Sequence, residues 1–172
     1  PIPKGIFQTQ LSELISALED KTVHVPPDLI VSGLALDSRK VEEGFLFFAL
    51  PGEKEDGGEF IAEAKARGAA CAVCEHPPET EIPYILVPDA HKALALCAAV
   101  WYGTPAGKLT VVGVTGTNGK TTTTYLIKQL LERTKGAKVG LIGTNQNLIS
   151  DKTIPTDRTT PDALTVQRLL AQ

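Results

Sequence analysis

A glycine-rich turn that ends in Gly-Lys-Thr, residues 116–121, has the residue types and spacing of a phosphate-binding loop. Gly116 and Gly119 permit backbone conformations that a Cβ would forbid, so successive N–H groups can point at one anion. Lys120 would bring a positive charge to the β- and γ-phosphates of a nucleotide, and the hydroxyl of Thr121 would ligate Mg²⁺.

The residues on either side of this turn predict the strand and the helix that such a loop requires. Residues 109–114 form a short apolar run rich in valine, which is typical of a buried strand. After the turn, Leu126, Ile127, Leu130 and Leu131 form an apolar stripe with helical spacing. The N-terminus of that helix would add unpaired N–H groups and the positive end of its dipole.

The loop departs from the strict nucleotide-binding pattern at one position. Val114 stands five residues before Gly119, where the pattern has a glycine, although Gly113 and Gly116 flank it. The alternative interpretation is a tight turn that binds no ligand. The order of strand, Gly-Lys-Thr and helix favours a nucleotide site.

The composition is that of a soluble globular protein, with 42% hydrophobic and 22% charged residues among 172. A net charge of −3 argues against a nucleic-acid or membrane-binding surface. No apolar run approaches the roughly 18 residues of a membrane span, and residues 1–14 lack the apolar core of a secretory signal. A cytoplasmic location is therefore expected.

Cysteine, histidine and acidic residues do not predict a second site. Cys71 and Cys74 form a C-x-x-C within an apolar run, where residues three apart on a strand face opposite ways. With Cys97 they are expected to be buried structural thiols and not a zinc or redox site. The scattered histidines, His24, His76 and His91, are expected at the surface. The acidic run at 53–59 is expected to be a solvated loop.

Strands and helices are predicted to alternate along the chain, which argues an α/β layer architecture. The predicted helices are residues 7–19, 59–67 and 90–102, and the predicted strands are 30–36, 45–50, 69–74 and 83–88. Asp89 is expected to cap the third of these helices.

The best domain boundary is the segment 103–108, which contains two glycines and a proline. A first α/β domain is predicted at 1–103 and the start of a second at 104–172. After the phosphate loop, the second domain has one more predicted strand at 138–144, a polar segment and a last helix from about residue 161. Because a parallel nucleotide-binding sheet is normally larger, the chain is expected to be part of a longer enzyme.

The loop sequence at 113–122 resembles the ATP loop of the Mur ligases, which build the peptide stem of the bacterial cell-wall precursor. The segment 36–39, Leu-Asp-Ser-Arg, and the segment 44–49 that follows it resemble the uridine-binding start of the MurE and MurF branches. The segments 140–144 and 159–164 resemble the MurE branch. The resemblance covers essentially the whole chain, most clearly residues 30–172.

This resemblance implies a small N-terminal UDP-binding α/β domain followed by the first part of a P-loop central domain. It implies an ATP-dependent ligase that adds a diamino acid, L-lysine or meso-diaminopimelate, to UDP-N-acetylmuramoyl-L-alanyl-D-glutamate through an acyl phosphate. ATP and Mg²⁺ are the implied cofactors, and a monomer without nucleic-acid or membrane partners is expected. The family's remaining catalytic groups would lie beyond Gln172, so the 172-residue chain is expected to be inactive alone.

The resemblance also assigns binding residues, with Lys120 as the catalytic residue. The residues that it implies for ATP binding are Gly116, Thr117, Asn118, Gly119, Lys120, Thr121 and Thr122. Leu36 and Ser38 would meet the uracil end of the substrate, and Thr159 and Thr160 would hold its muramoyl-dipeptide side. Arg158 stands where the family often has asparagine, and it could still bind a carboxylate. The loop at 53–55 contacts the nucleotide in relatives, often through a histidine, but here it reads Glu-Lys-Glu.

Two of these assignments also have a purely structural interpretation. The turn at Ser38 could be structural, and a threonine before Pro161 could simply cap a helix. Two further functions remain open: another ligase of the superfamily, of the MurF or cyanophycin synthetase type, or a non-catalytic module that binds a nucleotide or UDP-sugar.

Overall fold

The computed structural model describes residues 8–52, 56–155 and 160–172. The chain divides into two compact units, Pro1–Gly103 and Thr104–Gln172. In the described part of the chain, no helix is both long enough and apolar enough to cross a membrane.

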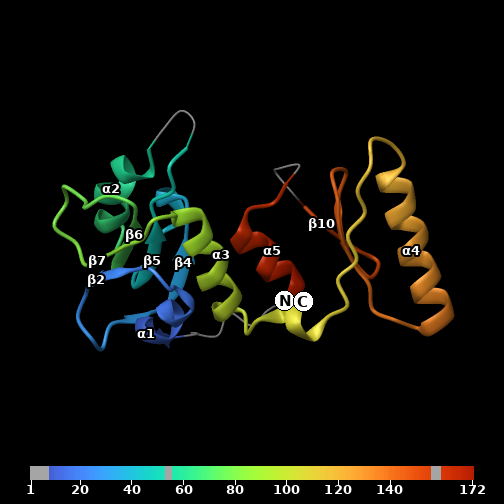
Figure 1. Ribbon diagram of the computed structural model, residues 1–172, viewed down its shortest axis with the longest axis horizontal. Coiled ribbons are helices and arrows are strands. Elements are labelled where there is room, and N and C mark those ends of the chain that lie inside the picture. Colours follow the sequence, from blue (N-terminus) through green and yellow to red (C-terminus); the bar gives the residue numbers. More distant parts are fainter. Residues whose placement is uncertain (1–7, 53–55, 156–159) are drawn as a thin grey trace. The chain divides into compact units, whose positions relative to one another are not determined.

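The first unit is a five-stranded sheet with helices on both faces. Its strands follow the order β2-β7-β6-β5-β4, and only β2 is antiparallel to its neighbour. The strands of this sheet are β2 (Thr22–His24), β4 (Gly33–Ala35), β5 (Phe45–Phe48), β6 (Cys71–Cys74) and β7 (Tyr84–Leu86). The helices are α1 (Leu11–Leu14), α2 (Ile61–Ala66) and α3 (Ala90–Trp101), with the 3₁₀ turns η1 (Ile15–Ala17), η2 (Ser38–Lys40) and η3 (Gly57–Phe60). Figure 1 shows α2 and α3 on opposite sides of the parallel strands.

Successive side chains of each strand point to opposite faces of the sheet, so the core of the first unit has one half on each face. Phe47 of β5 and Ala72 and Cys74 of β6 pack with Ile61 and Ala64 of α2 in one buried cluster. The residues between them, including Leu46, Phe48 and Val73, are also buried and face the other side, where α3 contacts β6. Burial on both faces explains why these strands read as continuous apolar runs.

The predicted elements of the first unit are largely confirmed, with three corrections. The helix predicted at 7–19 is wrong in extent, because among described residues it comprises only α1 and η1. The strand predicted at 30–36 is interrupted by Ser32, whose hydroxyl donates to the Glu43 carbonyl over 2.6 Å. It becomes β3 (Ile30–Val31), which pairs with β1 (Thr9–Gln10), and β4 in the main sheet. Strand β2 was not predicted, because it is short and exposed and has no apolar pattern.

The three cysteines are buried free thiols, as predicted. Burial raises the pKa of Cys71 and Cys97 to about 12 and that of Cys74 to about 11, so thiolate is scarce at neutral pH. We expect the native protein to react negligibly with a thiol-specific disulfide reagent at pH 8 over minutes. All three thiols should react once urea unfolds the chain. Rapid reaction of the native protein would contradict this burial.

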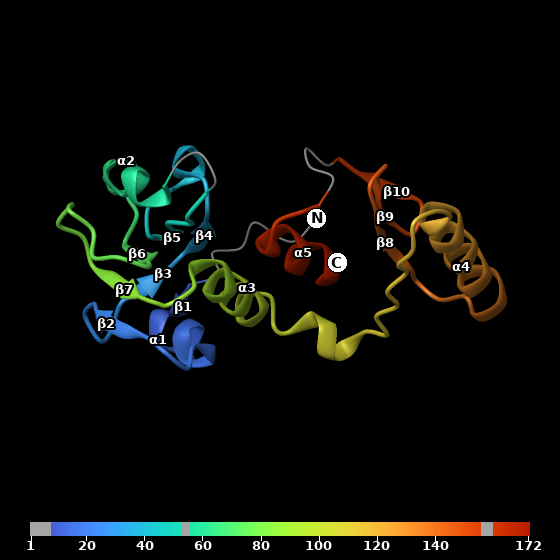
Figure 2. The same cartoon turned by 45° about the horizontal axis from the view of Figure 1, so that its top comes forward.

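The described part of the second unit contains two α-helices and a small antiparallel sheet. Its elements are η4 (Pro105–Lys108), α4 (Lys120–Lys135), β8 (Gly140–Ile142), β9 (Asn147–Ile149), β10 (Lys152–Ile154) and α5 (Ala163–Leu170). The strand order is β10-β9-β8, and both pairings are antiparallel. Figure 2 shows α4 beside this sheet, where it contacts β8.

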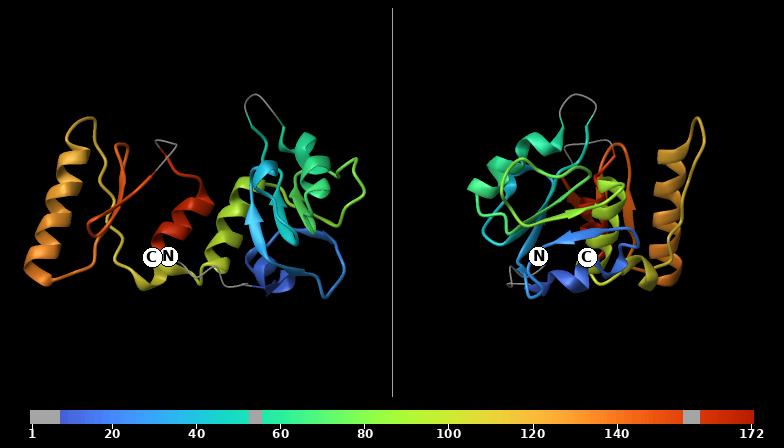
Figure 3. Two further views of the ribbon diagram at one scale, coloured as in Figure 1. Left: turned by 180° about the vertical axis from the view of Figure 1, so that it is seen from behind. Right: turned by 60° about the vertical axis from the view of Figure 1, so that its left-hand side comes forward.

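The strand predicted at 109–114 is wrong. Residues 109–114 are extended but unpaired with any described strand, and Val111 and Val112 are 66% and 58% exposed. Figure 3 follows this segment alongside α4. A buried strand needs neighbours that receive its hydrogen bonds, and no described strand of the second unit takes that place.

The polar segment after β8 is also corrected. It contains a hairpin, β9 and β10, joined by Ser150 and Asp151, where Ser150 has a φ of +50°. The usual two-residue hairpin turn carries Asn-Gly or Asp-Gly, so Ser-Asp gave no signal. The strand predicted at 138–144 exists as β8, but it pairs antiparallel with β9 and belongs to no parallel sheet among described residues.

Candidate functional site

The glycine-rich loop adopts the conformations that its glycines predict. Gly116 has a φ of +143° and Gly119 a φ of +79°, both in the region that side chains disfavour. Gly119 is the N-cap of α4, and no side chain caps that helix end. The N–H groups of the first turn, which have no acceptor within the helix, are therefore free to bind an anion.

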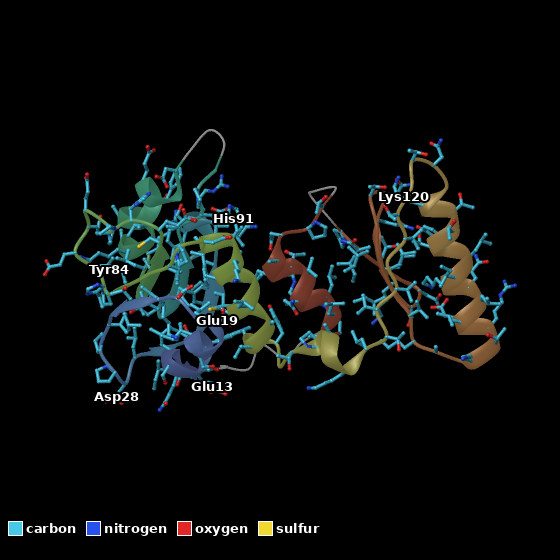
Figure 4. The ribbon with its side chains drawn as sticks, viewed as in Figure 1. Glu13, Glu19, Asp28, Tyr84, His91 and Lys120 are labelled. Atoms are coloured by element: carbon cyan, nitrogen blue, oxygen red, sulfur yellow. The ribbon has the colours of Figure 1, made fainter. Side chains whose placement is uncertain are left out.

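Lys120 lies at the first turn of α4 and bends back over the loop (Figure 4). Its ammonium group donates to the carbonyl oxygens of Gly116, at 2.5 Å, and Thr117, at 3.3 Å. The charge is thus held against the backbone of the loop and is exposed to solvent. A phosphate group bound to the N–H groups of this turn would meet that charge.

The hydroxyl-bearing residues of the loop suit a nucleotide with its metal ion. Thr117, Thr121 and Thr122 are exposed at the same helix end. A Cβ added at Gly119 would meet nothing within 4 Å, so the space over the loop is open. Mg²⁺ prefers oxygen ligands, and in nucleotide sites water molecules and phosphate oxygens supply most of them. A threonine hydroxyl beside an open anion site is therefore enough for the protein's share of the ligands. The residues present therefore fit ATP with Mg²⁺.

Ser38 and Leu36 lie just after β4, at the carboxyl end of the parallel strands. In open α/β sheets, ligands bind in the crevice outside this edge. Ser38 is buried in η2, and Leu36 is partly buried. Asp37 accepts the backbone N–H of Arg39 and pairs with its guanidinium over 2.8 Å, which holds the turn and lowers the pKa of that carboxyl.

A carboxylate that the sequence analysis overlooked controls the Ser38 hydroxyl. Ser38 Oγ donates to Glu63 Oε2 over 2.7 Å, and the other oxygen of Glu63 accepts from Arg67 over 3.2 Å. The hydrogen bond from Ser38, followed by that from Arg67, lowers the pKa of Glu63, although partial burial opposes the shift. No sequence motif indicated Glu63, since it lies 25 residues from Ser38.

The histidines lie at the surface, as predicted, and His91 has a definite contact. Its Nε2 lies 3.0 Å from the carbonyl oxygen of Pro51, in the loop after β5. The neighbouring N–H of Ala90 donates to Glu75 Oε1 after β6, and Asp89 caps α3 through the N–H of Lys92, as predicted. These bonds tie together the loops at the carboxyl ends of β5, β6 and β7.

Two predicted substrate residues, Arg158 and Thr159, lie outside the described residues, as does the loop at 53–55, to which no role was assigned. Thr160 is described and exposed. The expected cap by a threonine before Pro161 is not observed at Thr160, because Asp162 is the N-cap of α5 and accepts the Thr165 N–H over 2.8 Å.

Other features of the described residues do not compete with these sites. No group of three or more histidine, cysteine and acidic side chains there could hold a metal ion. Within the first unit, a cavity of about 170 Å³ lies between residues 17–20 and the start of α3, and Ser38 is not among its lining residues.

Comparison with known proteins matches both units to one family. Residues 30–102 match the family described as "Mur ligase family, catalytic domain", and residues 114–172 match "Mur ligase middle domain". Similar proteins include the UDP-N-acetylmuramoyl-L-alanyl-D-glutamate–2,6-diaminopimelate ligases of Geobacillus kaustophilus and Aquifex aeolicus. The first is 44% identical over 95% of this chain, and the second is 46% identical over 83%.

Solved structures give the same result. A UDP-N-acetylmuramoyl-L-alanyl-D-glutamate–2,6-diaminopimelate ligase matches 95% of this chain with a TM-score of 0.70 and 27% identity, and the chain covers 33% of it. The MurF of Acinetobacter baumannii matches 96% with a TM-score of 0.64 and 27% identity, over 33% of its own length.

The chain spans about a third of the length of the curated relatives it matches, 33% for the Geobacillus protein and 29% for the Aquifex protein. Family matches in both units, together with sequence identity above 40% across the boundary between them, confirm the resemblance drawn from the motifs. The chain belongs to the Mur ligase family.

Proposed function

We propose that this chain supplies the UDP-substrate-binding domain, residues 1–103, and the start of the ATP-binding domain, residues 104–172, of a MurE-type ligase. That enzyme adds a diamino acid to UDP-N-acetylmuramoyl-L-alanyl-D-glutamate during peptidoglycan precursor synthesis. The identity of 44% to a relative of this name, across 95% of the chain, carries the proposal. The geometry of the phosphate loop, with its free N–H groups and Lys120, supplies the chemical reason.

The proposed reaction has two steps. An oxygen of the substrate's terminal carboxylate attacks the γ-phosphorus of ATP, the bond to the β-phosphate oxygen breaks, and ADP leaves. The amine of the diamino acid then attacks the acyl phosphate carbon, phosphate departs with the bonding electrons, and the amine loses a proton as the peptide bond forms. Both steps bring anions together, so charge neutralisation and alignment supply most of the catalysis.

Residues 116–122 perform that neutralisation. The N–H groups at the start of α4 bind phosphate oxygens, and Lys120 leaves the carbonyls of Gly116 and Thr117 to contact the β- and γ-phosphates. Thr121 would hold Mg²⁺, which supplies further positive charge to the phosphate oxygens.

The remaining assignments follow the same proposal. Leu36 and Ser38 bind the uracil end of the substrate, while Arg158, Thr159 and Thr160 hold its muramoyl-dipeptide side. The enzyme works as a monomer in the cytoplasm, where ATP and the UDP-linked precursor meet.

A MurF-type ligase is the second candidate. The observation that favours it is the structural similarity to the Acinetobacter MurF, at the same 27% identity as the 2,6-diaminopimelate ligase structure. The two reactions differ in the acceptor amine, so the acceptor decides between them.

The test uses the full reading frame that contains these residues. Phosphate release is measured with Mg²⁺, ATP and UDP-N-acetylmuramoyl-L-alanyl-D-glutamate, with L-lysine, meso-diaminopimelate or D-alanyl-D-alanine added separately. We expect release that depends on one diamino acid and on the UDP substrate. No release with either diamino acid would refute the MurE assignment. For the MurF candidate, the matching assay supplies the UDP-linked tripeptide, and release that depends on D-alanyl-D-alanine would support it.

A further inference from the structure

The hydrogen bond to Glu63 fixes the direction in which the Ser38 hydroxyl donates its proton. Ser38 is 6% exposed, and its Oγ lies 2.7 Å from Glu63 Oε2. The pKa of Glu63 is lowered by this contact, so the carboxyl is ionised at neutral pH and can only accept hydrogen bonds. The single proton of the hydroxyl is therefore committed to Glu63.

A hydroxyl whose proton is committed retains only its acceptor lone pairs. Any ligand group that bonds Ser38 Oγ must then be a donor. In a uridine nucleotide the donors are the N3–H of uracil and the ribose hydroxyls. Cytosine has an acceptor at N3, and so it would face Ser38 with two acceptors and no proton between them.

The second contact of Glu63 keeps this arrangement in place. Arg67, one turn later along the chain, donates to Glu63 Oε1 over 3.2 Å, so both carboxylate oxygens are engaged by different partners. Glu63 lies in α2, whose inner face packs in the cluster that contains Phe47 of β5. The carboxylate is thereby positioned from the rigid core and not from a loop.

We propose that Glu63 is a positioning residue that makes Ser38 an obligate hydrogen-bond acceptor, and that it thereby selects a uridine nucleotide over a cytidine nucleotide. This inference rests on the proposed function, because it takes Ser38 as part of the UDP site. Glu63 itself does not contact the nucleotide. It acts by accepting the hydrogen bond that the Ser38 hydroxyl donates.

The experiment measures binding of UDP, CDP and the 2′- and 3′-deoxy forms of UDP to the full-length enzyme by calorimetry. The variants are Glu63→Ala, Glu63→Gln and Ser38→Ala. Glu79→Ala is the matched control, because Glu79 is an exposed carboxylate in the loop between β6 and β7. Kinetic constants for ATP and the UDP-linked substrate, and the thermal midpoint, are measured on the same proteins.

We expect Glu63→Ala to reduce the preference for UDP over CDP about tenfold, which is the scale of one hydrogen bond to a charged group. Glu63→Gln should retain most of the preference, since its amide oxygen can still accept the Ser38 proton. The KM for the UDP-linked substrate should rise, while the KM for ATP and kcat stay near wild type. A tenfold change that appears instead in the comparison of UDP with a deoxy form would place Ser38 on the ribose, and it would refute the selection of uridine over cytidine.

Three further outcomes would overturn the inference, and only the last of them also overturns the proposed function. Wild-type binding of UDP with unchanged preferences in Glu63→Ala refutes the role of Glu63 alone. Changes that appear equally in the KM for ATP, kcat and the thermal midpoint would show a merely structural role, which also refutes it. Failure of the wild-type enzyme to bind UDP refutes the inference together with the proposed function.

Discussion

Replacing Lys120 with methionine should lower ATP-dependent phosphate release by the full-length enzyme at least about 100-fold, the usual scale for losing a group that stabilises transition-state charge. Lys120 is the loop's lysine, and its ammonium already lies over the Gly116 carbonyl. Methionine keeps most of the side-chain length but removes the charge, so the γ-phosphoryl group would carry its negative charge without that partner. The loss should appear mainly in kcat.

Lys135→Met is the matched control, because Lys135 is exposed at the opposite end of the same helix. It should keep near wild-type activity. Circular dichroism should show the same helix content in both variants, since the Lys120 side chain is exposed and packs in no core. A Lys120→Met enzyme within a few-fold of wild type would refute the assignment of the loop as the ATP site.

Replacing Phe47 with alanine should destabilise the first unit by about 4 kcal/mol, within the range for emptying a buried aromatic site. Phe47 is 2% exposed in β5, and its partners on the neighbouring strands are Ala35 and Ala72. Both cross-strand neighbours are alanines, and a methyl group is too small to fill the volume that the phenyl ring leaves. The cavity therefore stays open and its cost is high.

Urea unfolding followed by the fluorescence of Trp101 measures this loss, since the chain's single tryptophan lies in α3 of the first unit. Phe47→Leu should lose clearly less than Phe47→Ala. Val23→Ala, in the exposed edge strand β2, should lose less than about 1 kcal/mol because Val23 is 43% exposed. A loss below about 1 kcal/mol for Phe47→Ala would contradict the central place of Phe47 in this core.

The phosphate loop could be predicted from the sequence because its conformation is local. Gly116 and Gly119 have the positive φ values that their lack of a Cβ allows, and α4 begins directly at Lys120. The backbone conformation of six consecutive residues and the start of one helix therefore follow from the local sequence. ATP binding at this loop stays a prediction. The role of Ser38 within a UDP site stays a prediction, as do those of Arg158 and Thr159.

The order of the parallel strands in the first unit was not readable from the sequence, although their existence was. Strands β5, β6 and β7 are short apolar runs between helices, so periodicity and breaker residues indicate them. Strand β2 carries no such pattern. It exists because β7 offers a free edge and because the ring of Tyr84 stacks on His24 at a centroid distance of 4.6 Å.

The second unit shows where local patterns mislead. The apolar run at 109–114 has the composition of a strand, yet no described strand pairs with it. The polar segment after β8 contains β9 and β10, which pair with each other, and β9 also pairs with β8. Hydrogen bonding between strands depends on which backbones meet, and composition reports only what each segment favours.

The sequence by itself determined the family, the phosphate loop and the pattern of apolar strands and helices. These depend on residues close together in the chain, whose spacing fixes backbone freedom and the side that is buried. Only the tertiary structure brought Glu63 to Ser38 across 25 residues and His91 to Pro51 across 40. Such contacts join side chains from different elements, and their partners are set by how the strands assemble, which no local spacing encodes.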